Sequence, residues 1–159
     1  MSIIYKENMM DFYGFYTGKI FDAYKYLGAH VEEKGVTFRT FAPSASRITL
    51  IGEFNDWQEW EMNKVSDGNF WECYVPQAKA GQMYKYKIYD RNGNPVDHCD
   101  PYGFGMELRP SSASIIRDMS KYKFKDSQWL QSRSDCRKKP LNIYEIHFGS
   151  FRKPSDKAR

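Results

Sequence analysis

The spacing of apolar residues follows a helical repeat in the first part of the chain. Over residues 8–28 the side chains of Phe12, Phe15 and Tyr16 share one helical face, and a second short helix is expected over residues 22–27. Two short helices this rich in aromatic residues cannot bury their apolar faces against each other alone. We therefore expect this N-terminal segment to dock on a larger body.

After residue 28 the repeat shortens to two, which is typical of β-strands with one buried face. Tyr84, Tyr86 and Ile88 face the expected core, while Lys85 and Lys87 between them face outward. The expected strands cover residues 36–42, 46–54, 70–76, 82–90 and 112–116. Short strands at this spacing, separated by turns rich in Gly, Asn and Pro, predict an immunoglobulin-like antiparallel β-sandwich.

The last part of the chain differs in character from the expected sandwich. Residues 118–140 are polar and mostly charged, so we expect a linker with a short helical turn near Trp129. Residues 143–148 are then almost continuously apolar, as in a strand buried on both faces. One such strand is not a domain, so residues 141–159 are expected to begin a further domain. Its unpaired strand edges would favour local disorder or self-association.

Composition and charge exclude several classes of protein. Lys and Arg number 24 and Asp and Glu 20, and the resulting charge of +4 is too small to predict a nucleic-acid partner. Three widely spaced cysteines do not form a disulfide framework and are typical of a reducing compartment. No segment has the apolar length of a signal peptide or a membrane span. We expect a cytoplasmic protein with no nucleic-acid and no membrane partner.

No set of residues has the composition and spacing of a catalytic or metal site. Residues 97–100 include Asp, His and Cys, but consecutive side chains diverge and lack the usual spacing of metal ligands. The three histidines have no evident Ser or Cys partner, and there is no Gly-rich phosphate loop. Glu59 and Glu61 lie in a loop that we expect to be solvated. The pattern favours a binding module over an enzyme, with no metal and no cofactor.

One stretch, residues 48–60, combines a strand with a candidate binding residue. The strand contains Gly52, where the backbone of a neighbour can approach closely, and it runs into the turn residues Asn55 and Asp56. Trp57 follows directly, and a flat apolar ring beside polar groups can stack on a sugar. The alternative is that Trp57 packs against the end of the sheet.

Several motifs together resemble one protein family. They are LGAH (27–30), GVTFRTFAPSAS (35–46), GEFNDW (52–57), GNFWE (68–72), YKYKI (84–88), DPYGF (100–104), ELRPSSASII (107–116) and IYEIHFGSF (143–151). In this order they are similar to the N-terminal part of bacterial glycogen branching enzymes, the 1,4-α-glucan branching enzymes of glycoside hydrolase family 13. FNDW and YKY by themselves indicate only a family-48 carbohydrate-binding module. The motifs on either side narrow the resemblance to branching enzymes.

The resemblance implies a fold, a domain order and a parent reaction. Residues 1–28 would be the helical segment, 29–117 a mainly β sandwich module, 118–140 the linker and 141–159 a stub of a (β/α)8 barrel. The parent enzymes cleave an α-1,4-glucan and transfer the chain to a 6-hydroxyl, forming an α-1,6 branch. Such retaining chemistry needs two carboxylates about 5 Å apart. In this family they come from later barrel strands, so we expect this chain to be inactive by itself.

The resemblance also implies two partners, an α-1,4-glucan such as glycogen or a maltooligosaccharide, and the missing catalytic barrel. Trp57 matches the stacking Trp of the FNDW turn, and Lys85 matches the Lys of YKY, whose ammonium donates to sugar hydroxyls. Asn94 lies in a loop where such modules often add a contact. The alternative is a structural module that braces the barrel and binds no sugar. An exposed Trp57 favours binding, and a buried one favours bracing.

Overall fold

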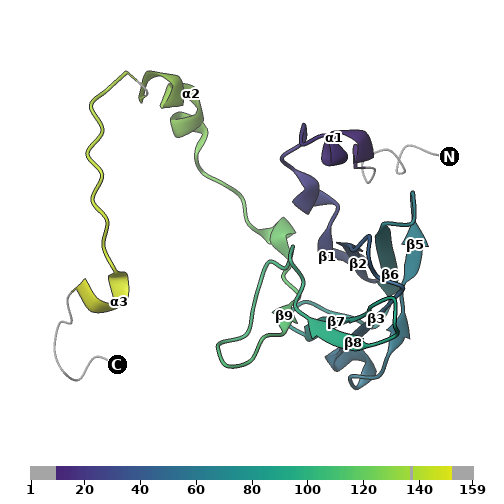
Figure 1. Cartoon of the computed structure of the whole chain (residues 1–159). Coiled ribbons are helices and arrows are strands. Elements are labelled where there is room, and N and C mark those ends of the chain that lie inside the picture. The colour runs from purple at the N-terminus through teal and green to yellow at the C-terminus, as the bar shows by residue number, and fades with distance from the viewer. Residues whose placement is uncertain (1–9, 137, 152–159) are drawn as a thin grey trace, which may run out of the picture. The chain divides into compact units, whose positions relative to one another are not determined.

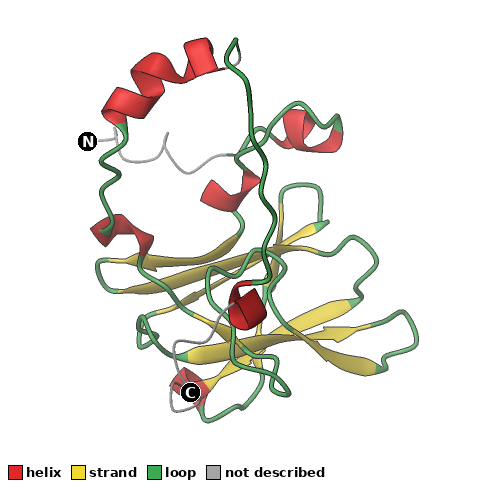
Figure 2. Ribbon diagram, turned by 90° about the vertical axis from the view of Figure 1, so that its left-hand side faces the viewer, coloured by secondary structure: helices red, strands yellow, loops and turns green. Residues whose placement is uncertain are grey.

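A computed structural model describes residues 10–136 and 138–151 of the chain (Figure 1). The chain divides into two compact units, Met1–Lys121 and Tyr122–Arg159, and each is described by itself. The first unit is mainly β, with antiparallel strands throughout, and Figure 2 shows these strands lying close together. This agrees with the predicted β-sandwich.

The first sheet has four strands in the order β1-β2-β6-β5. These are β1 (Gly28–Glu32), β2 (Gly35–Phe41), β6 (Phe70–Val75) and β5 (Asn63–Val65). All three neighbouring pairs are antiparallel. The strands β1 and β5 were not among the expected ones, and both are edge strands of this sheet.

The second sheet has five strands, with β7 at its centre. They are β4 (Trp60–Glu61), β3 (Arg47–Gly52), β7 (Met83–Tyr89), β8 (Pro95–His98) and β9 (Ser114–Ile115). The order is β4-β3-β7-β8. The strands β8 and β9 both pair with the side of β7 that faces away from β3: β9 pairs with the first residues of β7, and β8 pairs with the last residues of β7. Residues 46–54 and 82–90 were predicted as separate strands, and the fold makes them direct neighbours.

The core lies between the two sheets and is formed by the alternate residues of each strand. Tyr84 and Tyr86 of β7 are fully buried, which confirms the predicted inward face, and Ile88 is partly buried. The ring centroids of Phe38 and Tyr84 lie 4.9 Å apart, so the rings pack edge to face across the core. The face of β7 that carries the lysines is thereby directed outward.

A buried carboxylate links the second sheet to the chain that follows it. Asp100 is only 3% exposed and accepts hydrogen bonds from the hydroxyls of Tyr84 (2.7 Å) and Tyr86 (3.1 Å). The backbone N–H of Tyr102 donates to its other carboxylate oxygen at 2.8 Å. Ser114 accepts from the Asp100 backbone N–H at 2.8 Å. Burial raises the pKa of the Asp100 carboxyl, because the charged form loses its hydration.

The N-terminal segment is less helical than its pattern predicts. It contains only α1 (Phe12–Tyr16) and a 3-10 turn, η1 (Ala23–Lys25), and β1 begins where the second helix was expected to end. The prediction of helix over residues 8–28 was therefore wrong in extent. Helices this short gain little from their own backbone hydrogen bonds, so contacts with the sheet decide where they end.

These contacts form a second apolar cluster on the outer side of the first sheet. The rings of Phe12 and Phe15 lie 4.8 and 5.4 Å from the ring of Phe70 on β6, and Phe15 also lies 5.0 Å from Phe41 on β2. The N-terminal segment was expected to dock on a larger body, and the first sheet is that body.

The described residues of the second unit form two helices, α2 (Ser127–Cys136) and α3 (Phe148–Phe151). The expected helical turn near Trp129 is thus a longer helix. The strand expected from residue 143 is absent from the described part of this unit, and α3 occupies its end. A strand needs a neighbour for its backbone hydrogen bonds, and none of the described residues pairs with this segment. No helix in the described residues has the length and apolarity to cross a membrane.

Candidate functional site

Trp57 lies in the loop between β3 and β4, two residues after the end of the 3-10 turn η2 (Glu53–Asn55). Asn55 holds this loop together: its amide donates to the carbonyls of Leu50 (3.2 Å) and Gln58 (2.7 Å), and its oxygen accepts from the Gly52 N–H (2.9 Å). The Trp57 N–H donates to the Gly52 carbonyl at 2.9 Å. Asn55 was predicted as a turn residue, and its side chain organises the turn.

Gly52 permits the close approach that its position in the strand indicated. A Cβ atom there would lie 2.7 Å from the carbonyl oxygen of Met83 and 2.7 Å from the ring of Phe54. Only glycine allows the β3 backbone, and with it the start of the Trp57 loop, to lie this close to β7.

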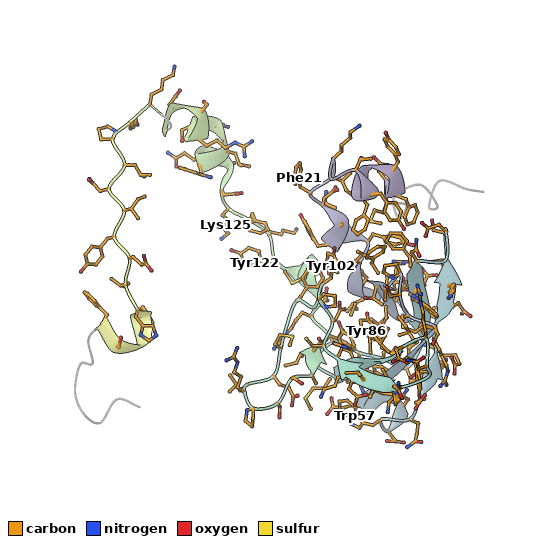
Figure 3. All side chains as sticks on the ribbon, in the orientation of Figure 1. Phe21, Trp57, Tyr86, Tyr102, Tyr122 and Lys125 are labelled. Carbon is orange, nitrogen blue, oxygen red and sulfur yellow. The ribbon has the colours of Figure 1, made fainter. Side chains whose placement is uncertain are left out.

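The backbone of the loop turns the Trp57 side chain into solvent. Asp56 and Trp57 both adopt left-handed conformations, with φ of 52° and 59°, which is unusual for a residue as bulky as Trp. Such conformations persist where surrounding bonds hold them, and they are common at binding sites. The Trp57 side chain is 42% exposed, and it lies at the edge of the first unit, away from the buried Tyr86 (Figure 3). By the criterion set out above, this exposure favours binding over bracing.

Lys85 lies on β7 at the same end of the second sheet as the Trp57 loop. It is directly opposite Ile51 of β3, one position from the Gly52–Tyr84 pair at which the loop begins. Its neighbours Tyr84 and Tyr86 point into the core, so Lys85 points outward and is half-buried. Within the described residues its ammonium has no ion pair or hydrogen bond, which leaves its donors available.

Asn94 lies at the other end of β7, in the turn that leads to β8. Its side chain donates to the Asp90 carboxylate at 3.0 Å, and its backbone N–H donates to the other oxygen at 2.9 Å. The side-chain bond holds the pKa of Asp90 below its usual range. Tyr89, the last residue of β7, is four positions further along the strand than Lys85, a distance of about 14 Å. The structure therefore brings Trp57 and Lys85 to one end of the sheet and leaves Asn94 at the other.

A shallow cavity of about 300 Å³ lies at the Asn94 end. It is formed by the loop between β2 and β3, the end of β7 and the strand β8. Its apolar lining includes Pro43, Ile88 and Val96, and its polar lining includes Asp90, Asn94 and His98.

Glu59 is a central residue of the outer face that the sequence analysis missed. Its carboxylate accepts from the hydroxyls of Tyr89 (2.7 and 2.8 Å) and Thr49 (3.2 Å), and it lies 3.2 Å from Arg47 and 3.8 Å from Lys87. The hydrogen bond from Tyr89 is the main cause that lowers the Glu59 pKa. Glu59 is exposed, as expected, and its hydrogen bonds and ion pairs also attach the Trp57 loop to β3 and β7.

The charged network extends across the outer face of the second sheet. The Arg47 guanidinium lies 4.6 Å from the ring centroid of Tyr89 and pairs with Glu61. On the other side Lys87 lies 3.7 Å from Asp97 of β8. Positive and negative groups alternate, so this face offers many hydrogen-bond donors and acceptors without a strong net charge. The alternation of residues along β3 and β7 could have predicted that these side chains face outward. It could not have predicted that they lie beside one another.

The residues of the candidate metal motif do not converge. Asp97 points outward to Lys87, whereas Asp100 is buried against Tyr84 and Tyr86. In the part of the chain that the structure describes, no group of three or more His, Cys, Asp or Glu side chains is arranged to hold a metal ion.

Comparison with known protein families identifies one match. Residues 26–103 match Carbohydrate-binding module 48 (Isoamylase N-terminal domain). The matched residues run from just before β1 to just after Asp100, so they include the Trp57 loop and most of both sheets.

Curated relatives resemble almost the whole chain. The 1,4-alpha-glucan branching enzyme GlgB of Fusobacterium nucleatum subsp. nucleatum is 38% identical over an alignment of 157 residues, and the match covers 97% of this chain and 26% of that protein. The protein of the same name from Dechloromonas aromatica is 39% identical over 149 residues, covering 91% of this chain and 24% of its own length. The chain spans about a quarter of the length of these relatives.

Solved structures resemble more than half of the chain in fold. The maltotriose complex of the PulA-G680L mutant from Klebsiella pneumoniae matches with a TM-score of 0.50 and 25% identity, over 58% of this chain and 11% of that one. A putative alpha amylase from Salmonella typhimurium matches with a TM-score of 0.51 and 20% identity, over 65% of this chain and 16% of that one. The second likeness concerns the fold alone.

Proposed function

We propose that the chain, whose residues 26–103 form a carbohydrate-binding module 48 domain, is the N-terminal part of a 1,4-α-glucan branching enzyme and binds α-glucan. The similarity to curated branching enzymes over nearly the whole chain supports this proposal. The longer protein would cleave an α-1,4-glucan and transfer the chain to form an α-1,6 branch. The residues described here hold glucan but supply no catalytic carboxylates. Cys73 and Cys99, which are free cysteines among the described side chains, suit the reducing cytoplasm.

The observation that carries glucan binding is the exposed Trp57 ring on a loop held by several hydrogen bonds. The apolar face of a sugar ring stacks well on such a platform. Because Asn55 and Glu59 fix the loop before the ligand arrives, little conformational entropy is lost on binding.

The three predicted residues receive different roles in this proposal. Trp57 stacks on a glucose unit, and Lys85, which lies at the same end of the sheet, donates to its hydroxyls. Asn94 contacts only a glucan long enough to follow β7 to its far end. Between them the Glu59 network presents further donors and acceptors to the sugar hydroxyls.

A titration with a maltooligosaccharide, followed by Trp fluorescence, tests the proposal. We expect saturable quenching that the Trp57→Ala variant loses. The matched control is Trp129→Ala, which removes a Trp that is 56% exposed on the second unit and should leave the quenching unchanged. No fluorescence change at millimolar sugar would contradict glucan binding and would support the alternative, a module that only braces the barrel.

We also propose that residues 141–151 become the first strand of the barrel in the longer protein. The exposed large side chains of this segment include Leu141, Ile143, Tyr144 and Phe148, an unfavourable arrangement in water. Neighbouring barrel strands would bury these side chains and pair with the backbone.

A further inference from the structure

We propose that Glu53 is a positioning residue of the glucan site: its carboxylate holds the Trp57 loop against the end of β7 that carries Lys85. The inference rests on the proposed function, because it concerns the same site and the same ligand. It adds a residue that contacts no sugar itself and acts by fixing the separation between Trp57 and Lys85.

The carboxylate of Glu53 bonds to the backbone of β7. Its Oε2 atom accepts from the N–H of Met83 at 2.8 Å. Met83 is the first residue of β7 and lies one position before Tyr84, which is directly opposite Gly52 of β3. Because Glu53 follows Gly52 in the chain, this bond continues the attachment of the two strands beyond their last residue pair. The Trp57 loop thus leaves β3 while it is still bonded to β7.

The three residues of η2 attach the loop in three different directions. Glu53 bonds to β7, as described above. The Phe54 side chain packs in the core, where its ring centroid lies 5.4 Å from that of Phe38. Asn55 bonds to the end of β3 and to the loop itself. Among these three side chains, only that of Glu53 forms a hydrogen bond to β7 within the described residues.

Another attachment of the loop to β7 lies near the far end of that strand. Glu59 accepts from the hydroxyl of Tyr89, the last residue of β7, at 2.7 and 2.8 Å, and it lies 3.8 Å from Lys87. The Trp57 loop is therefore attached near both of its ends, by Glu53 at the start of β7 and by Glu59 toward the end of β7.

The Glu53 bond lies close to Lys85. Met83 and Lys85 are two positions apart on β7, about 7 Å along the strand. A sugar that stacks on Trp57 and accepts from the Lys85 ammonium needs these two groups at one fixed separation. The loop backbone is left-handed at Asp56 and Trp57, a conformation that surrounding bonds must hold. Without the Glu53 carboxylate the loop could move away from β7, and binding would then have to order it again.

Glu53 contributes little to the fold itself, so its role can be tested by substitution. Its side chain is exposed, and β3 and β7 keep all six of their paired positions without it. The Glu53→Ala variant should therefore remain folded. Glu53→Gln keeps a side-chain oxygen that can accept from the Met83 N–H, so this variant retains the bond and loses only the charge.

Titration of the whole chain and its variants with maltoheptaose, followed by Trp fluorescence, tests the inference. Glu53→Ala should bind about fivefold more weakly, which corresponds to the loss of one hydrogen bond. Glu53→Gln should bind nearly as the unchanged chain does. The control is Glu33→Ala, because Glu33 is also an exposed Glu and lies in the turn between β1 and β2. This control should leave the affinity unchanged.

A second set of variants separates positioning from a general loosening of the loop. Lys85→Met removes the ammonium that Glu53 is proposed to keep near Trp57. In the Lys85→Met chain, the further change Glu53→Ala should weaken binding by much less than about fivefold, because effects of residues that act together are not additive. Urea unfolding of each variant shows that it remains folded.

Other results would overturn the inference, and they separate it from the proposed function. If Glu53→Ala binds maltoheptaose as the unchanged chain does, Glu53 has no positioning role while glucan binding at Trp57 stands. An equal loss in Glu53→Gln or in Glu33→Ala would assign the effect to charge. A loss that is as large in the Lys85→Met chain would show that Glu53 does not act through Lys85. If the unchanged chain does not bind maltoheptaose, the proposed function itself fails, and the inference fails with it.

Discussion

At the scale of single residues, the position of a polar or aromatic side chain depends on the bonds around it. Trp57 is exposed because Asn55 and Gly52 hold its loop in a left-handed turn. Asp100 is buried because two tyrosine hydroxyls and a backbone N–H occupy its oxygens. Glu59 fixes the Trp57 loop from the outer face.

Glu59→Gln is expected to weaken the attachment of the Trp57 loop modestly. The charge on Glu59 pairs with Arg47 and Lys87 at an exposed site, so the loss in unfolding free energy should stay below about 1 kcal/mol. The Glu59 pKa is lowered from 4.5 in the folded chain. The ionised carboxylate therefore contributes fully to the unfolding free energy above pH 4.5, and this contribution is lost as the pH falls through the lowered pKa. Urea unfolding of both proteins at pH 7 and pH 3 measures this difference, which should be smaller at pH 3 than at pH 7.

Asp100 is expected to give the opposite dependence on pH. Its pKa is raised above 3.8 by burial, so protonation favours the folded state, and this gain appears as the pH falls through the raised pKa toward 3.8. Relative to Asp100→Asn, the unfolding free energy of the unchanged chain should therefore rise over this interval. Asp100→Ala should cost about 3 kcal/mol at neutral pH, because two buried tyrosine hydroxyls lose their acceptor. Equal pH profiles for the Asn variant and the unchanged chain would contradict the assignment.

At the scale of elements, β7 organises the second sheet, and the first sheet organises the N-terminal segment. β7 pairs with β3, β8 and β9, and its two faces supply both the core tyrosines and the outer lysines. The N-terminal segment has too few backbone hydrogen bonds to be stable alone, so its aromatic contacts with β2 and β6 keep it in place.

Removing these contacts should release the segment without unfolding the sandwich. We expect Phe12→Ala/Phe15→Ala to lose amide protection over residues 10–27 in hydrogen exchange, while β3 and β7 keep theirs. Tyr13→Ala is the control, since Tyr13 is mostly exposed and makes none of the contacts with Phe70. Loss of protection throughout the first unit would show that the segment and sandwich unfold together.

At the scale of the whole molecule, stability resides in the first unit. Both apolar clusters of buried residues are formed between residues 10 and 116, and the division between the units follows residue 121. In the second unit, the large apolar side chains among the described residues are exposed, notably Ile143 and Phe148. The second unit thus adds exposed apolar surface and no described core.

A chain ending at residue 121 should therefore fold as the longer one does. We expect its melting temperature by circular dichroism to lie within a few degrees of that of the 159-residue chain, because no buried cluster is removed. Light scattering should show less self-association, since the exposed apolar segment is gone. A much lower melting temperature would mean that residues 122–159 stabilise the sandwich.

The sequence by itself determined those features that depend on local pattern. Alternation predicted the strands β2, β3, β6, β7 and β9 and the inward face of Tyr84 and Tyr86. The FNDW turn marked Trp57, and the motif order indicated a carbohydrate-binding module. A strand repeat or a turn is encoded by neighbouring residues, so it can be recognised without knowledge of the fold.

Only the tertiary structure decided which distant residues meet. The pairing of β3 with β7 joins Glu59 to Tyr89 and Lys87, and the direction of β7 separates Asn94 from Trp57. The N-terminal helices are shorter than predicted because the first sheet determines their contacts, and residues 143–147 form no strand because no described neighbour pairs with them. The physical reason is the same in each case. Strand pairing and burial are interactions between segments far apart in the chain. The local pattern indicates that a segment must pack against another segment, but it does not indicate which one.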